Sequence, residues 1–228
     1  MPAVAGAFPY NIDNLLGGAV RILYGDPAGT PATGIPASIA DVINMTSPYA
    51  PKTGWVDLGA TKESFTYTRG FDVEGWEIQQ NQGNVIEEIT QITRSIEVSV
   101  AEFKPETLQI IENAPTVADV AAAVGASAQK RVSFGSFQSP KRRRFAFIAR
   151  RSNASGLVIE PGAGGIQRGR FFMGVIYQAQ IAAADTSIEQ AKGALTASGV
   201  TFTCFPDASQ AQGSEYGAYY DELAGTIT

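Results

Sequence analysis

Apolar and polar side chains alternate along the middle of the chain, within the stretch Gly83–Ala114. The apolar series is Ile92, Ile96, Val98 and Val100, and the polar series between them is Thr93, Ser95, Glu97 and Ser99. This period of two predicts a strand with one apolar and one polar face. Upstream, Val85 and Ile89 are out of step with Ile92, which predicts a bulge or sharp bend near Thr90–Gln91. Extended throughout, the strand would reach roughly 55 Å.

A short helix is predicted directly after this strand. Pro105 suits a first helical position, Glu106 places an acidic side chain in the first turn, and Leu108 and Ile111 follow at helical spacing. Three further segments have short-helix or turn character: Pro36–Met45, Thr116–Val124 and Ser187–Leu195.

Other stretches predict strands from alternating or continuous apolar residues. These are Gly18–Gly25, Gly54–Gly59, Lys62–Asp72, Arg131–Phe137, Arg144–Ala149, Gly156–Ile159, Phe171–Ala183 and Gly199–Phe205. With two or three short helices and no βαβ rhythm, the pattern favours a mainly β, antiparallel sandwich or barrel. We expect a single domain over residues 1–228, with a flexible N-terminal arm (about 1–17) and a loose C-terminal tail (about 207–228).

Composition narrows the function classes. The chain has 228 residues, 44% of them hydrophobic, with one cysteine and no histidine. Histidine-based catalysis and the commonest zinc ligand are therefore excluded. The single cysteine excludes an internal disulfide and fits a reducing assembly compartment. No signal peptide or transmembrane helix is expected. We expect a protein that is not an enzyme and holds no cofactor or metal.

The net charge of −5 is divided between two blocks. Residues 57–119 hold 12 acidic and 4 basic side chains, a balance of −8, whereas residues 130–170 hold 10 basic and 1 acidic, a balance of +9. Two interpretations remain open. The blocks are solvated faces of one globule, or they complement each other in a head-to-tail assembly of several copies.

The short sequence motifs give little indication of a catalytic or ligand-binding site. Gly162–Gly165 lacks the Gly-Lys-Ser/Thr ending of a phosphate-binding loop and reads as a hairpin tip. The basic run Lys141–Arg144 favours an interaction loop or solvated turn over a nucleic-acid site. Glu87 and Glu88 are adjacent, so a regular strand points their carboxylates to opposite faces. Cys204 lies between Phe202 and Phe205, which predicts a buried, inert thiol.

Four segments carry a family resemblance: Gly54–Lys62, Gly83–Ser99, Ala101–Leu108 and Val200–Asp207. Their order resembles the major tail tube proteins of long-tailed (siphovirus-type) bacteriophages. The resemblance implies a β-barrel-like protomer in hexameric rings with a shared β-barrel lumen, stacked into a tube that conducts double-stranded DNA during ejection. It implies a virion protein assembled in the host cytoplasm, with other copies, the tape measure protein and tail-tip or terminator proteins as partners. DNA would pass without sequence-specific binding, and the protein would not insert into a membrane.

Two sets of residues follow as candidates for this function. The lumen-facing candidates are Thr93, Ser95, Glu97, Ser99 and Glu87. The candidates for contacts between rings or subunits are Trp76, Gln79, Gln80, Asn81, Gln82, Lys141, Arg142, Arg143 and Arg144. Acidic groups in a lumen would repel DNA phosphates, so that the genome slides.

Other functions remain as alternatives. The chain could be another phage structural part, such as a tail terminator or head decoration protein. It could also be a carbohydrate-binding adhesion sandwich that uses Trp55, Trp76 and Tyr67. An enzyme is the third hypothesis, disfavoured because no catalytic constellation is present.

Overall fold

The structure is a computed structural model of the chain. It describes residues 20–29, 31–46, 49–59, 61, 65–77, 84–102, 104–113, 117–122, 127–133, 135, 140–150, 158–159, 167–182, 187–191 and 194–223. The described part is mainly β, with one α helix and one short 3-10 helix. The expected N-terminal arm (1–17), the Gln79–Gln82 tip and the Gly162–Gly165 loop lie outside the described residues.

The strands are β1 (Val20–Gly25), β2 (Trp55–Asp57), β3 (Thr66–Glu77), β4 (Asn84–Val100), β5 (Val117–Val120), β6 (Gln129–Val132), β7 (Arg143–Arg150), β8 (Val158–Ile159), β9 (Gln167–Ile181), β10 (Ser187–Ala191), β11 (Ala194–Phe205) and β12 (Gly217–Leu223). The helices are η2 (Ile39–Asp41) and α1 (Pro105–Ile111).

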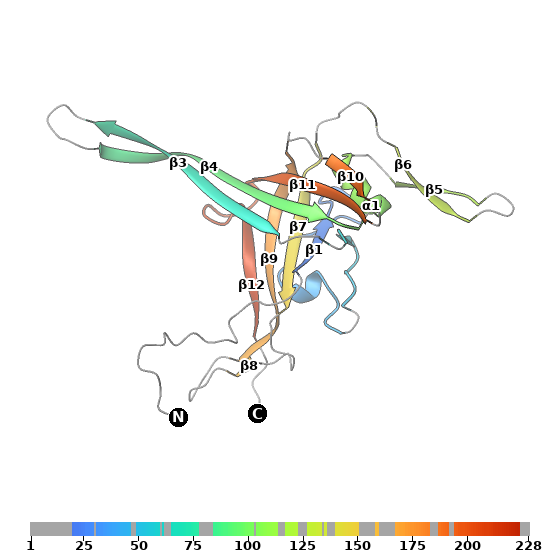
Figure 1. Cartoon of the computed structure of the whole chain (residues 1–228). Coiled ribbons are helices and arrows are strands. Elements are labelled where there is room, and N and C mark those ends of the chain that lie inside the picture. The colour runs from blue at the N-terminus through green and yellow to red at the C-terminus, as the bar shows by residue number, and fades with distance from the viewer. Residues whose placement is uncertain are drawn as a thin grey trace, which may run out of the picture.

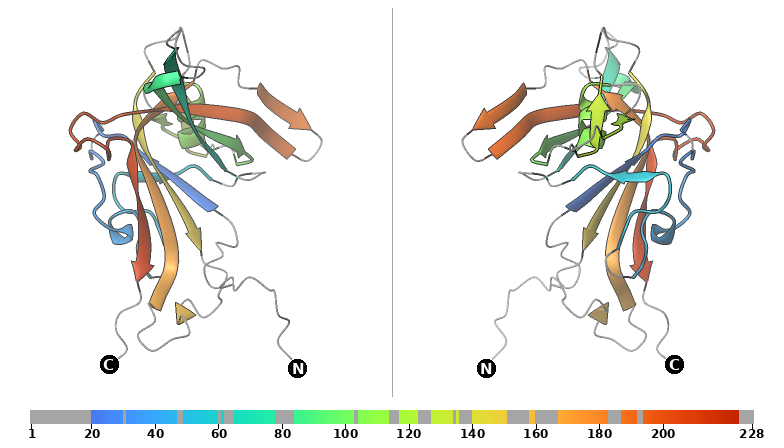
Figure 2. Two further views of the ribbon diagram at one scale, coloured as in Figure 1. Left: turned by 90° about the vertical axis from the view of Figure 1, so that its left-hand side faces the viewer. Right: turned by 90° about the vertical axis from the view of Figure 1, so that its right-hand side faces the viewer.

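Ten strands form one antiparallel sheet in the order β2-β1-β7-β9-β11-β4-β3, to which β8, β10 and β12 add at the side. The central strand β9 pairs with β7 along one edge, and its other edge is shared by β11 and β12. Because β11 and β12 diverge, the sheet divides into two layers. Figure 2 shows β1, β7, β9 and β12 running down from a crossing layer that contains β4, β10 and β11. β5 and β6 form a separate two-stranded sheet.

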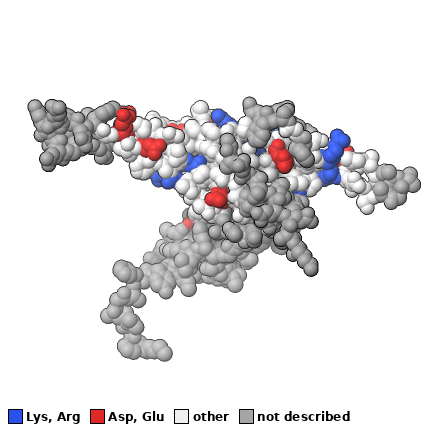
Figure 3. Space-filling view, turned by 45° about the horizontal axis from the view of Figure 1, so that its top comes forward, with Lys and Arg blue, Asp and Glu red and all other residues white. Residues whose placement is uncertain are grey.

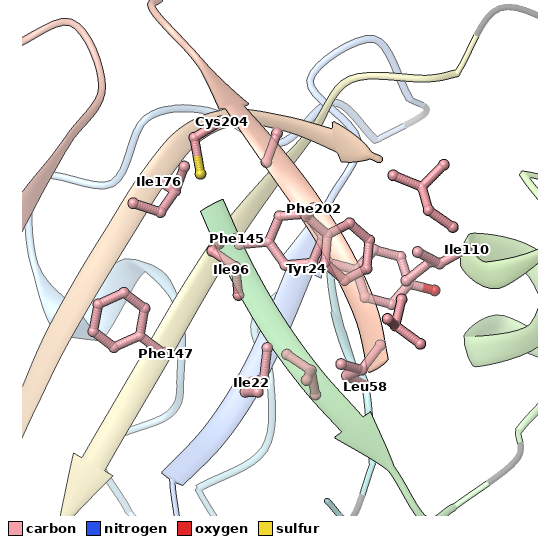
Figure 4. Packing of buried hydrophobic residues seen from close by; sticks show 14 of the residues in the cluster. Ile22, Tyr24, Leu58, Ile96, Ile110, Phe145, Phe147, Ile176, Phe202 and Cys204 are labelled. Carbon is pink, nitrogen blue, oxygen red and sulfur yellow. The ribbon is translucent and has the colours of Figure 1, made fainter. Parts of the chain in front are cut away.

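The main core fills the angle between these layers. Side chains from β1, β4, β7, β9, β11 and α1 meet there (Figure 4), and the rings of Phe145 and Phe202 lie 4.6 Å apart. A second apolar cluster covers the other face of β7 and β9, with Trp55 and residues around η2 packed on it. Both faces of β9 are therefore buried, as its two-sided apolar sequence predicted.

The central prediction for β4 is confirmed. β4 is a single strand of 17 residues, and α1 begins at Pro105. Asp72 pairs with Gln91 and Val73 with Ile89, which leaves Thr90 as the extra residue of a bulge. This extra residue explains why the apolar residues Ile89 and Ile92 are three positions apart in the sequence instead of two or four.

Other predictions need correction. The mainly β antiparallel class is confirmed, but no closed barrel forms among the described strands, because β2 and β3 each have one neighbour. Thr116–Val124 contains β5 instead of a helix: pairing with β6 sets Asp119 opposite Lys130 and overrides the helical character of the alanines. Ser187–Leu195 holds β10 and the start of β11. Pro36–Met45 contains only the turn η2.

The expected loose tail also differs in the structure. From residue 217 the chain forms β12, which pairs with β9. Before it, the carboxylate of Asp207 accepts hydrogen bonds from the backbone N–H and hydroxyl of Ser209, at 3.0 and 2.7 Å. Tyr220 donates to the carbonyl of Pro36 at 2.6 Å. Pairing partners distant in sequence therefore order this segment.

Candidate functional site

The β3–β4 hairpin projects from the body of the protein (Figure 1). β11 pairs with β4 only from Ser95 to Val100. Beyond that point β3 is the neighbour of β4, so residues 69–77 and 84–94 form a two-stranded extension that we call the arm. Both outer edges of the arm present backbone groups without strand partners among the described residues. Such edges are where another strand can add.

One face of the arm is polar from the pair Gly70–Thr93 to the pair Glu74–Glu88, and the next pair on this face is Trp76–Ile86. Thr93 and Gln91 on β4 lie opposite Gly70 and Asp72 on β3, and beyond the bulge Glu88 lies opposite Glu74. The described non-glycine side chains of this series are exposed. Towards the body the same series continues through Ser95 and Glu97.

The strand register therefore places the lumen-facing candidates on both faces of the β3–β4 hairpin. Thr93 and Glu97 are exposed, and Ser95 and Ser99 are partly buried in the same alternating series. Glu87 pairs with Gly75, out of step with this series, whereas Glu88 is in step. The bulge at Thr90 is the physical reason, because one extra residue exchanges the two positions.

The opposite face of the arm is apolar and exposed. The exposed fractions are 55% for Phe71, 45% for Val73, 57% for Ile89 and 45% for Ile92. Single exposed apolar residues are common, but four on neighbouring positions form a patch of the kind that marks an interaction site. A partner that covered them would contribute about 1 kcal/mol for each half-exposed side chain.

The sequence does not predict this patch. Alternation within Lys62–Asp72 predicts a strand, but it does not show whether Phe71 faces the core or solvent. The polar run Gln79–Gln82 after β3 was the available signal. It places the end of the hairpin in solvent, far from a core that could cover Phe71 and Val73.

Two arginines occupy the base of the apolar face. Arg69 on β3 lies directly opposite Arg94 on β4. Arg94 donates from Nη1 to the hydroxyl of Tyr67 at 3.2 Å, and its guanidinium lies 4.3 Å from the ring centre of Tyr216. Its Nε is buried without a hydrogen-bond partner among the described residues.

A hollow of about 350 Å³ adjoins Arg94 where β11 leaves β4 at Pro206. Ile92, Tyr216 and Cys204 contribute to its lining. Cys204 is buried, and burial raises the pKa of its thiol to about 12, so the thiolate is scarce at neutral pH. The predicted burial of Cys204 is confirmed.

The basic run Lys141–Arg144 does not form one exposed contact surface. Arg143 and Arg144 are each 5% exposed, and burial lowers the pKa of both guanidinium groups. Arg144 donates to the carbonyl of Thr33, and Arg143 faces the ring of Tyr24. A register shift against β9 between residues 143 and 145 accompanies the burial of successive positions. The prediction of these two as subunit contacts is wrong for this structure, whereas Lys141 and Arg142 are exposed.

The aromatic residues considered for carbohydrate binding are not assembled into a platform. Trp55 is 7% exposed and packs in the second cluster, whereas Tyr67 packs against the main core and contacts Arg94. Trp76 belongs to β3, towards the tip of the arm. The described residues therefore do not bring Trp55 and Tyr67 to one surface.

The α1 and β5–β6 region lies on the opposite side of the body from the arm (Figure 1). The Lys130 ammonium is 2.5 Å from the Glu106 carboxylate, and this hydrogen bond is the main cause that lowers the pKa of Glu106. Thr107 donates to the carbonyl of Leu58 at 2.9 Å. Figure 3 shows acidic side chains along the arm and basic ones on the β5–β6 hairpin.

The chain matches no protein-family model, and no curated protein matches it. Among the described residues, no helix combines the length and apolar character needed to cross a membrane. The same residues contain no group of three or more cysteine or acidic side chains placed to hold a metal ion.

Proposed function

We propose that the protein is the major tail tube subunit of a long-tailed bacteriophage, a structural virion protein. In this proposal copies join side by side into hexameric rings, and the rings stack into the conduit for double-stranded DNA during ejection. The observation that carries the proposal is the arm, which has a polar face from Thr93 to Glu88, an exposed apolar face and, among the described residues, free strand edges on both sides.

A ring accounts for all three properties. Neighbouring arms would pair along their free edges and complete a sheet that no single chain closes. The polar face would line a water-filled lumen, and the neighbouring subunit would cover the apolar face. Asp72, Glu74, Glu88 and Glu97 would make that lumen acidic and repel DNA phosphates.

The remaining parts of the proposal come from the resemblance of the sequence. The subunit would be located in the phage tail after assembly in the host cytoplasm. It would contact the tape measure protein inside the tube and tail-tip and terminator proteins at the ends. Lys141, Arg142 and the Gln79–Gln82 tip remain the candidates for contacts between stacked rings.

Negative-stain electron microscopy of the purified protein tests the proposal. We expect rings or tubes of uniform diameter, formed alone or after seeding with tail tips. Phe71→Ser combined with Ile89→Ser should abolish them, whereas Thr93→Ser on the polar face, as the matched control, should leave them intact. Single rings that never stack would indicate a terminator. A wild-type protein that stays monomeric at high concentration and with seeds would overturn the proposal.

A further inference from the structure

Arg69 and Arg94 form a like-charge pair across the two strands at the base of the arm. Like charges directly opposite each other destabilise an antiparallel pair. Arg69 is exposed, and none of the ion pairs between described residues includes either arginine. Glu215 is close enough to Arg94 that the guanidinium, after backbone hydrogen bonds, contributes to lowering the pKa of the Glu215 carboxyl. Two guanidinium groups against this acidic group still leave an excess of positive charge at the face of the exposed apolar side chains.

The environment of Arg94 favours a carboxylate as the missing partner. Its Nε is a buried donor with no acceptor among the described residues, which destabilises the folded state while the group stays unpaired. The hollow of about 350 Å³ beside it is large enough for an incoming side chain. Guanidinium groups bind carboxylates through charge-assisted hydrogen bonds.

The exposed side of α1 offers a matching surface. Glu102 and Glu106 already have lysine partners, Lys104 at 3.0 Å and Lys130 at 2.5 Å. Glu112 is exposed and belongs to none of the ion pairs between described residues. Leu108 is partly buried and lies one turn earlier on the same side of the helix, which places an apolar group beside the carboxylate of Glu112.

The arm and α1 lie on opposite sides of the molecule near the same end (Figure 1). A copy placed alongside could therefore lay its arm over the α1 of its neighbour, which is a head-to-tail contact. The apolar face of the arm would meet Leu108, and Arg69 and Arg94 would meet Glu112. Each of the two surfaces combines apolar side chains with charged ones, and the charges on the two surfaces have opposite signs.

We propose that the apolar face of the arm docks on α1 of a second copy of this chain, with Glu112 of that copy bound between Arg69 and Arg94. This inference rests on the proposed function, because it assigns the contact that joins neighbours within a ring. It defines which two surfaces meet and the charge pair that selects them.

Reciprocal charge reversal tests the contact. Arg69→Glu and Glu112→Arg are made singly and together, with Lys52→Glu as an exposed control of equal charge change to Arg69→Glu. Self-association is measured by sedimentation velocity, and circular dichroism checks that each variant is folded. We expect each single variant to associate about tenfold or more weakly than wild type, and Lys52→Glu to associate normally. The double variant should recover.

Mixing the two single variants gives the decisive measurement. The arm of each variant then meets an oppositely charged α1 on the other variant, so an equimolar mixture should associate more strongly than either variant alone. A mixture as dissociated as its components would overturn the contact.

If wild type forms tubes and the single variants also form them normally, the contact is wrong while the tail tube function stands. If association depends on the charge pair but gives no rings, the contact stands and the tail tube function fails. A wild-type protein that never associates would overturn both.

Discussion

The hydroxyl of Tyr24 on β1 donates a hydrogen bond to the backbone carbonyl of Glu106 in α1, 2.9 Å away. The two residues are 82 positions apart in the sequence. Burial raises the pKa of Tyr24 far above its ordinary value, so the hydroxyl keeps its proton at any pH at which the protein is studied. This bond attaches the first turn of α1 to the main sheet.

Replacing Tyr24 by Phe should lower the free energy of unfolding by about 1–2 kcal/mol, because the Glu106 carbonyl loses its partner in a part-buried setting. Urea denaturation followed by circular dichroism measures the change. Tyr219→Phe is the matched control, since Tyr219 is 61% exposed and keeps its ring contacts. Equal effects of the two substitutions would contradict this role of Tyr24.

Gly174→Ala should destabilise the contact between β7 and β9. A Cβ atom at Gly174 would lie 2.0 Å from the ring of Phe147, closer than non-bonded atoms approach. We expect a loss of about 1–3 kcal/mol, since the ring must move within a packed core. Gly34→Ala is the control, because no atom of the described residues other than its chain neighbours lies within 4 Å of the added Cβ. Thermal unfolding of both variants gives the comparison, and an unchanged melting temperature for Gly174→Ala would refute it.

Asp207 should contribute to stability in a defined pH window. Hydrogen bonds from Ser209 are the largest cause that lowers the pKa of its carboxyl below the ordinary value of 3.8. A lowered folded-state pKa gives a contribution that is complete above the unfolded-state pKa and is lost as the pH falls through the folded-state one. Asp207→Asn should therefore weaken the protein at neutral pH and flatten the loss of stability below about pH 4.

Urea denaturation across this pH range measures the Asp207 contribution, with the exposed Asp72→Asn as control. We expect the control to keep the wild-type slope. An Asp207→Asn variant with the wild-type acid profile would show that the Ser209 hydrogen bonds do not stabilise the folded state in this way.

Reversing charges on the polar face of the arm should affect DNA passage and leave assembly intact, if the proposed function holds. Glu88→Lys with Glu97→Lys would place cations where DNA phosphates pass and slow ejection. Glu88→Gln with Glu97→Gln, which only removes charge, should fall between this variant and wild type. Release of DNA from virions carrying each variant measures the rate. Normal ejection from the double lysine virions would remove the lumen assignment.

Features decided by neighbouring residues could be predicted from the sequence. The alternation through Ile96, Val98 and Val100 predicted β4, and the three-residue step from Ile89 to Ile92 predicted the bulge at Thr90. Pro105 predicted the start of α1. The polar half of the arm followed from the same pattern. In each case residues within a single helix or strand determine its local structure.

Features decided by pairing could not be predicted in this way. β5 forms because β6 adds to it across the intervening segment, although alanines around Val120 suggest a helix. Arg143 and Arg144 are buried because loops and β9 surround that end of β7, which a run of basic residues does not reveal. The exposed face of Phe71 looks like core until the arm is seen to extend past the body.

The sharing of one β9 edge by β11 and β12 has a consequence for how the chain is made. β12 is the last strand in the described sequence, and the bond from Tyr220 to Pro36 spans 184 positions. In a nascent chain, the part of this β9 edge from Arg168 to Ile176 therefore lacks its partner strand until Gly217–Leu223 has been synthesised. Open strand edges favour aggregation during synthesis. Chains truncated before Gly217 should consequently accumulate in inclusion bodies even though the main core residues are all present.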